Sequence, residues 1–250
     1  MRRSYSLLLP CLLPLLVFLF ACSATNSDPG EEDLAILFIG NSLTYTNDLP
    51  GVLRDMLNKN GNARVFVEAI AEPNFGLVDH WINSKARSRI SSAPWDYVVL
   101  QQGPSASSEG RTSLIGYSKE FATIIRDAGA VPALYMVWPE EGRLFDFAGV
   151  RASYLAAADS VDGLFLPSGA AWEEYWNRDG SVPLYGPDGF HPSAEGTYLA
   201  AVVMWEQFTG GDANDLDNIP GAEYGGIKIT ASVGRQLHDA AHLANSKYAR

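Results

Sequence analysis

The sequence predicts an α/β protein, a three-layer α/β/α sandwich around a mostly parallel five-stranded sheet. The first observation is that short apolar runs alternate with stretches of helical period along most of the 250 residues. Such alternation is typical of right-handed β-α-β crossovers, which place helices on both faces of the sheet. The second is composition, because 47% hydrophobic residues suffice for one large core and 19% charged residues are too few for a disordered chain.

The expected strands share a short length, an apolar run and turn-forming residues at their boundaries. They span residues 33–39, 64–71, 95–101, 131–138 and 163–166. Helical periodicity predicts helices over 53–60, 77–90, 114–128 and 150–160, one after Ser193 to about Phe208 and a last one over 230–249. Parallel strands end at one edge of the sheet, so we expect functional residues after the first four strands and in the C-terminal loops.

The charge of the chain excludes one class of partner. Acidic residues outnumber basic residues by 29 to 18, which gives a formal net charge of −11. Binding to nucleic acid requires clustered Lys and Arg against the phosphates, so we expect no nucleic-acid partner. Anionic lipids repel an acidic surface, so we expect contact with a membrane only through a lipid anchor.

The first residues have the pattern of an export signal. Arg2 and Arg3 precede an apolar run over 7–21, and its fifteen residues are fewer than the roughly 20 that a transmembrane helix needs. We therefore expect a signal peptide over 1–21. The run ends in Leu-Phe-Ala-Cys22, which resembles the lipobox of bacterial lipoproteins, and an ordinary signal peptide with a chance cysteine is the alternative. The lipobox implies an exported membrane lipoprotein, lipidated at Cys22, at the cell surface or in the periplasm.

One domain is expected to follow this segment. Residues 22–32 are mostly polar and predict a short tether, and residues 33–250 continue without a linker or an internal repeat. The other cysteine, Cys11, lies inside the predicted signal peptide. The mature chain is therefore expected to form no internal disulfide.

The first candidate for chemistry is Ser42, in the sequence Gly40-Asn41-Ser42 directly after the first expected strand. A tight turn there exposes a hydroxyl at the carboxyl edge of the sheet, which is the position of a nucleophile. The elbow of the α/β-hydrolases is disfavoured, because it needs a glycine two residues after the serine, where this chain has Thr44. The alternative is an ordinary turn in which Ser42 caps the following helix.

The second candidate is the loop that carries Asp188 and His191, three residues apart among glycines and prolines. This spacing lets the carboxylate contact one imidazole nitrogen while the other nitrogen faces outward. A serine hydroxyl needs such a base, because its own pKa is far above neutral. The alternative is that Asp188 and Ser193 only form turns and cap the next helix, with His191 on the surface.

Together the two segments resemble the SGNH (GDSL-like) hydrolase superfamily, which pairs a Gly-Asp/Asn-Ser block with a late Asp-x-x-His block. The similarity extends over about residues 36–201 and implies the flavodoxin-like, three-layer fold of that superfamily. It implies that Ser42 is the nucleophile, that His191 is the general base and that Asp188 orients the imidazole. No metal and no organic cofactor is then needed.

The resemblance also implies an oxyanion hole made by the backbone N–H groups of Ser42 and Gly76 and by a side-chain amide after the third strand. The superfamily has a Gly-x-Asn-Asp block there, whereas this chain reads Gln101-Gln102-Gly103. A branch that reads Val-Val-Leu-Gln at this place favours Gln101 as the donor, and Gln102 is the alternative. A Gln side chain offers the same N–H through one more methylene.

Other residues have less specific patterns. We expect Trp138 and Tyr185 to line the substrate pocket, because each lies beside a predicted catalytic loop. His238 and His242 lie one helical turn apart, but no third ligand is evident, so a solvated helix face is favoured over a metal site. His80 is expected to pack a helix.

The sequence thus predicts a secreted, lipid-anchored serine esterase. Its expected substrate is a small-molecule or polysaccharide ester, with an O-acetylated carbohydrate favoured by the export signal and the aromatic content. Two alternatives stay open: a non-catalytic glycan-binding surface lipoprotein on the same scaffold, and a hydrolase of lipid esters or thioesters.

Overall fold

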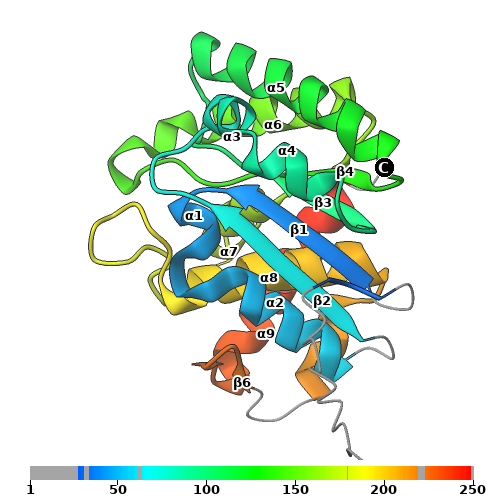
Figure 1. Cartoon of the computed structure of the whole chain (residues 1–250). Coiled ribbons are helices and arrows are strands. Elements are labelled where there is room, and N and C mark those ends of the chain that lie inside the picture. Colours follow the sequence, from blue (N-terminus) through cyan, green and yellow to red (C-terminus); the bar gives the residue numbers. More distant parts are fainter. Residues whose placement is uncertain (1–27, 31–33, 61–63, 179, 219–222, 249–250) are drawn as a thin grey trace, which may run out of the picture.

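The computed structural model describes residues 28–30, 34–60, 64–178, 180–218 and 223–248 (Figure 1). The predicted signal peptide, Cys22 and the tether, apart from 28–30, lie outside the described residues. The described chain forms a parallel sheet of five strands in the order β2-β1-β3-β4-β5. The strands are β1 (Leu34–Gly40), β2 (Val65–Ala71), β3 (Tyr97–Leu100), β4 (Val131–Tyr135) and β5 (Leu164–Leu166). The expected α/β sheet is confirmed.

The central strand β1 pairs with β2 on one side and with β3 on the other. Helices cover both of its faces, and every residue of β1 after Leu34 is buried. Burial on both faces explains why this strand is a continuous apolar run in the sequence and does not alternate. It also places the end of β1, and the turn after it, between the ends of two neighbouring strands.

Two helical layers cover the sheet (Figure 1). One contains α3 (Leu77–Asn83), α4 (Lys85–Ile90), α5 (Ser108–Asp127) and α6 (Phe147–Ser160). The other contains α2 (Leu49–Asn60), α7 (Ser168–Trp176), α8 (Ala194–Thr209) and α9 (Ala231–Lys247). The short helix α1 (Ser42–Tyr45) and the 3₁₀ turns η1 (Thr46–Asp48), η2 (Glu141–Asp146) and η3 (Ala213–Asn218) complete the helical elements.

The structure differs from the sequence expectations in three helical regions. The helix expected over 77–90 breaks at Ser84, whose φ of 64° is left-handed and separates α3 from α4. Helix α5 begins earlier than expected, because the side chain of Ser107 accepts a hydrogen bond from Gly110 N–H and caps it. Helix α7 was not expected. The stretch between the last two expected helices contains η3 and a hairpin of β6 (Glu223–Tyr224) and β7 (Ile227–Lys228).

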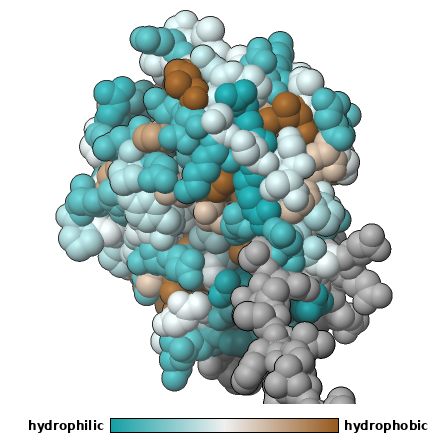
Figure 2. All heavy atoms as spheres, in the orientation of Figure 1, coloured by the Kyte–Doolittle hydropathy of each residue, from teal (hydrophilic) through white to brown (hydrophobic). Residues whose placement is uncertain are grey.

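The face in Figure 2 is mostly hydrophilic, with hydrophobic residues in small separate patches. The large hydrophobic side chains that are most exposed are Phe145 at 77% and Ile82 at 73%. No helix among the described residues is long and apolar enough to cross a bilayer.

The start of α8 fixes the loop that carries Asp188 and His191. Ser193 caps the helix by accepting the N–H of Gly196, and its hydroxyl donates to Pro183 O at 2.7 Å. A Cβ atom on Gly196 would lie 2.3 Å from Leu184 O and 2.7 Å from a ring carbon of Trp172. The absence of a side chain at position 196 therefore lets the helix pack directly against the base of the loop.

We expect Gly196→Ala to destabilise the fold, because the backbone of Leu184 cannot move aside without shifting the loop. Overpacking of this kind costs about 1–3 kcal/mol in free energy of unfolding, which exceeds the helix propensity gained. Gly116→Ala is the matched control, because Gly116 lies in α5 with nothing within 4 Å of its added Cβ. That variant should gain about 0.5–1 kcal/mol. Urea unfolding measures both, and equal stabilities would contradict the packing argument.

Candidate active site

Ser42 is the first residue of α1, immediately beyond β1. Asn41, not Ser42, caps this helix, because its side chain accepts the N–H of Leu43 at 3.1 Å. The alternative interpretation of Ser42 as a helix cap is therefore wrong. The Ser42 hydroxyl and backbone N–H make no hydrogen bond to any described residue, and the side chain is partly exposed. Both groups are available to a ligand.

The amide of Gln101 holds the turn before Ser42. Its Oε1 accepts the backbone N–H of Asn41 and the hydroxyl of Thr44, both at 2.8 Å. Its Nε2 donates to Asn41 Oδ1 at 2.9 Å and to Gln102 O at 2.7 Å. Gln101 is fully buried, so water does not compete for these bonds. The structure thus places the amide of Gln101, the favoured oxyanion donor of the sequence, against the turn that carries Ser42.

The loop after Leu184 brings Asp188 and His191 into contact. His191 Nδ1 lies 2.5 Å from Asp188 Oδ2, while Asp188 Oδ1 accepts the backbone N–H groups of Phe190 and His191 at 3.0 and 2.9 Å. The hydrogen bond to His191 is the main cause that lowers the pKa of Asp188 to about 2. The carboxylate therefore stays charged and fixes the imidazole by Nδ1, which leaves Nε2 for other chemistry.

Backbone contacts join the two ends of this loop. Gly186 N–H donates to His191 O at 2.7 Å, and Tyr185 and Pro192 form an antiparallel bridge. Trp138 supports the tip, because its indole N–H donates to Phe190 O at 3.0 Å. Trp138 is fully buried and stacks on Trp172 at 3.7 Å between ring centroids, so it does not line a substrate pocket as expected.

Asn47 ties the Ser42 segment to the His191 loop. Its side-chain N–H groups reach Pro192 O at 3.0 Å, Ser193 O at 3.1 Å and Thr197 Oγ1 at 2.9 Å. Its φ of 54° lies in the left-handed region, which Asn tolerates better than most residues. The two stretches are about 145–150 positions apart in the sequence. Sequence reasoning missed Asn47, although an Asn in a turn sequence after a candidate nucleophile is a signal of such a position.

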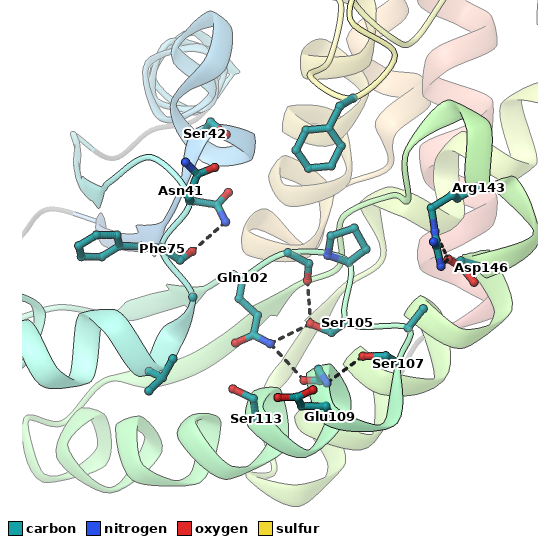
Figure 3. A pocket seen from close by; sticks show the side chains of 18 residues that line it. Asn41, Ser42, Phe75, Gln102, Ser105, Ser107, Glu109, Ser113, Arg143 and Asp146 are labelled. Atoms are coloured by element: carbon teal, nitrogen blue, oxygen red, sulfur yellow. Dashed lines mark hydrogen bonds and ion pairs between the residues drawn. The ribbon is translucent and has the colours of Figure 1, made fainter.

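A first cavity of about 650 Å³ opens beside Ser42 (Figure 3). Ser42, Gly76 and Gln102 line it, and Asp188, His191 and Gln101 are not among its lining residues. Several lining residues were not expected from the sequence: Asn41, Phe75, Ser105, Phe190 and the ion-paired Arg143 and Asp146. Phe190 precedes His191 and contacts its ring, so the cavity extends from the Ser42 turn to the His191 loop.

The expected oxyanion donors differ in availability. Gly76 N–H donates to Asp79 Oδ2 at 2.8 Å, and Gln102 Nε2 donates to Ser105 Oγ at 2.8 Å. In Figure 3 the Gln102 side chain extends away from Asn41 toward Ser105. Of the three, only Ser42 N–H has no acceptor among the described residues. A substrate oxygen would have to replace internal acceptors at the other two.

Tyr185 lines a second cavity, not the first. Its ring is 8% exposed and its hydroxyl donates to Pro139 O at 2.6 Å. His80 is buried in α3, as expected for a packing histidine, and its Nε2 lies 2.7 Å from Gly40 O, two residues before Ser42. Burial lowers the pKa of His80, so its neutral ring donates to Gly40 O at ordinary pH.

The two histidines of α9 make separate contacts. His238 is buried with Nε2 2.8 Å from the Tyr198 hydroxyl, so the interpretation of a fully solvated face is wrong at this residue. His242 Nδ1 lies 2.8 Å from Glu206 Oε1, and this hydrogen bond is the main cause that raises the pKa of His242. The described residues contain no group of three or more His, Cys, Asp or Glu that could hold a metal ion.

A scan against protein-family models and a search of curated proteins gave no match. A solved structure from Slackia heliotrinireducens, described as a candidate SGNH hydrolase, is similar over 70% of this chain and 99% of its own, with 26% identity and a TM-score of 0.60.

Two more solved structures have the same fold at lower identity. A DUF4886 family protein from Bacteroides uniformis matches 86% of this chain and 95% of its own, with 18% identity and a TM-score of 0.70. An acetyl xylan esterase from Geobacillus stearothermophilus matches 73% of this chain and 96% of its own, with 16% identity and a TM-score of 0.52. The chain therefore has the fold of the SGNH (GDSL-like) hydrolases, the superfamily that its Gly-Asn-Ser and Asp-x-x-His segments resemble.

Proposed function

We propose that this protein is a serine esterase with Ser42 as nucleophile, His191 as general base and Asp188 as the residue that orients the imidazole. The observation that carries the proposal is the contact between Asp188 and His191, in a loop that Asn47 ties to the Ser42 segment. A carboxylate on Nδ1 keeps the proton there, and Nε2 is then the basic nitrogen. Ser42 supplies a hydroxyl that no described residue engages.

In the proposed reaction Ser42 Oγ attacks the ester carbonyl carbon and its proton passes to His191 Nε2. The tetrahedral intermediate collapses, the bond to the alcohol oxygen breaks, and the alkoxide takes the proton from Nε2 as it leaves. A water molecule then attacks the acyl-enzyme and gives a proton to Nε2, and Ser42 recovers that proton when the carboxylic acid departs. Asp188 stabilises the imidazolium that forms twice in this cycle.

We propose that the oxyanion is held by Ser42 N–H, Gly76 N–H and the amide of Gln102. Gln102 is preferred to Gln101, because Gln102 lines the cavity beside Ser42 while the amide of Gln101 is buried and saturated by internal bonds. Substrate binding has to release Gly76 from Asp79 and Gln102 from Ser105. Donors of this kind become effective when they face the charge that develops in the transition state.

The proposed substrate is an O-acetylated carbohydrate. One solved structure with the same fold is an acetyl xylan esterase, and the export signal directs the chain to where polysaccharides occur. Attachment to the membrane through lipid on Cys22 is part of the proposal, and no nucleic-acid partner is expected. Neither a metal nor an organic cofactor enters the proposed steps.

A second candidate function is glycan binding without catalysis on the same scaffold. The observation that favours it is that two of the three expected oxyanion donors already have internal acceptors. Hydrolysis of a lipid ester or thioester is a third candidate, and the shared fold does not separate it from deacetylation.

Labelling of the serine tests the proposed function directly. A fluorophosphonate probe should attach to the wild-type chain and not to Ser42→Ala, since only an activated hydroxyl displaces its leaving group. His191→Ala should slow both labelling and hydrolysis of p-nitrophenyl acetate by on the order of 10³-fold or more, because the base is lost. Mass spectrometry locates the label, and circular dichroism shows that the variants fold. A wild-type chain that is never labelled would favour the glycan-binding protein.

The pH dependence follows from the low pKa of Asp188. The pKa of Asp188, about 2, lies below the ordinary value of 3.8. The ionised carboxylate therefore contributes fully to the free energy of unfolding above about pH 4, and this contribution is lost as the pH falls toward 2. Asp188 should therefore stay ionised, and contribute no change to kcat/KM, at any pH above about 4. Asp188→Asn should lower kcat/KM by on the order of 10⁴-fold, the loss typical of an imidazole in the wrong tautomer. Retained activity at neutral pH would contradict the role of Asp188.

The two glutamines should respond differently to substitution. Gln102→Ala should lower kcat by about 10²–10³-fold, the usual loss of one oxyanion donor. Gln101→Ala should instead lower the free energy of unfolding by about 1–3 kcal/mol, because buried partners on Asn41 and Thr44 lose their hydrogen bonds. Its kcat falls as a consequence of the disordered turn. Steady-state kinetics and urea unfolding separate the two effects, and a Gln102→Ala variant with full kcat would exclude Gln102 from the oxyanion hole.

A further inference from the structure

A second cavity of about 980 Å³ shares no lining residue with the Ser42 cavity. Its lining comes from both flanks of the His191 loop, from η1, from η2, from the end of α7 and from the start of α8. The residues are Asn47, Glu141, Leu144, Trp176, Pro183, Leu184, Tyr185, Gly186, Pro187, Pro192, Ser193 and Glu195. A cavity of this size is large enough for a small organic ligand, and the reaction steps above do not use it.

The floor of this cavity is apolar. Trp176 and Tyr185 stack with their ring centroids 5.9 Å apart and their planes at 26°, and prolines from both flanks of the loop surround them. The Tyr185 hydroxyl is already bound to Pro139 O, so the residue offers its ring and not its hydroxyl. Leu144 on η2 is 46% exposed and extends the apolar surface at the rim. This surface suits the C–H groups of a ligand.

The polar groups around the floor are acceptors. The carboxylates of Glu141 and Glu195 and the carbonyl oxygen of the Asn47 side chain make no hydrogen bond or ion pair to another described residue. The Asn47 N–H groups are occupied by the loop. None of the described residues that line the cavity is a Lys, Arg or His. A ligand with several hydroxyl donors on an apolar frame meets these acceptors, and an anionic ligand is repelled by both carboxylates.

The position of the cavity relates it to the leaving group. Proposed oxyanion donors lie in the Ser42 cavity, whereas the alcohol is proposed to take its proton from His191 and is therefore expected to lie next to the His191 loop. Both flanks of that loop, at Gly186 and Pro192, belong to the second cavity. Glu141 N–H donates to Gly189 O at 2.8 Å, so the η2 wall of the cavity is fastened to the tip of the same loop.

We propose that the second cavity is the subsite for the alcohol part of the ester, and that this part is an uncharged sugar ring with free hydroxyl groups. The inference rests on the proposed esterase function, because the alcohol side is defined by His191. It adds where the sugar binds and which class of glycan is accepted. Neutral glycans are bound, and uronic-acid glycans are rejected by Glu141 and Glu195.

Binding to the Ser42→Ala chain tests the subsite without requiring catalysis. Calorimetry with xylotriose as the neutral probe should show binding, and trigalacturonic acid should bind at least tenfold more weakly at low ionic strength. Glu195→Gln in the same background should weaken xylotriose binding about tenfold, since a charged acceptor is lost. The double variant Glu141→Gln, Glu195→Gln should bind xylotriose and trigalacturonic acid with affinities that differ less.

Glu109→Gln is the matched control, because Glu109 lines the Ser42 cavity and not the second one. It should leave the xylotriose affinity unchanged. The subsite is refuted if xylotriose does not bind, if Glu109→Gln weakens it while Glu195→Gln does not, or if trigalacturonic acid binds as well as the neutral probe. In the wild-type chain, Glu195→Gln should raise the KM for acetylated xylotriose.

These outcomes are independent of the labelling of Ser42. A chain that binds xylotriose as expected but is never labelled keeps the subsite and loses the esterase. A chain that is labelled but shows no preference for the neutral probe keeps the esterase and loses the subsite.

Discussion

The buried amide of Gln101 is the interaction on which the geometry of the site depends. It joins the end of β3 to the turn after β1 by accepting from Asn41 N–H and the Thr44 hydroxyl and by donating to Asn41 Oδ1. Because Gln101 is buried away from water, an amide that lost these partners would remain unpaired, which would lower the free energy of unfolding. A Cβ on Gly40 would lie 2.5 Å from Gln101 Oε1, so glycine is needed there. The turn therefore has one favourable conformation, and it presents Ser42 outward.

The proposed base, His191, is positioned in a different way: a local contact with Asp188 fixes its ring, and distant contacts fix the loop that carries both residues. Asp188 and His191 meet within one tight loop, so their contact needs no help from the rest of the fold. The orientation of the pair does depend on the rest of the fold, because Asp188 and His191 lie in an irregular loop between Leu184 and Ser193. The indole of Trp138, the amide of Asn47 and the close approach of Gly196 fix this loop from three sides.

The internal partners of the proposed oxyanion donors have a consequence for the proposed catalysis. Gly76 N–H and the Gln102 amide are satisfied by Asp79 and Ser105, so they are not left unpaired before a substrate arrives. Replacing these acceptors by a neutral substrate carbonyl yields little binding free energy, whereas replacing them by an oxyanion yields more. The arrangement therefore favours binding in the transition state over binding in the ground state. If the second cavity binds the sugar as proposed, its acceptors supply binding energy remote from the reacting carbonyl.

The sequence by itself determined the α/β class, the approximate extent of all five strands and the two segments of the candidate triad. These are local properties, because an apolar run buried in a sheet and a Gly-shaped turn each depend on a few neighbouring residues. The contact of Asp188 with His191 follows from a spacing of three residues in the same way. The sequence did not predict three features: the break at Ser84, helix α7 and the hairpin of 223–228. Packing overrides a weak local preference there.

Only the tertiary structure decided which glutamine faces the cavity and what the aromatic residues do. Gln101 and Gln102 are adjacent and identical in type, but successive residues at a strand end point to opposite sides, and only the neighbours of each side chain distinguish a framework amide from a cavity amide. Trp138 is next to a strand end in the sequence, yet it lies under the loop because Trp172 from α7 stacks on it. The tie from Asn47 likewise joins segments far apart in the chain, and no local pattern can specify a contact between such distant residues.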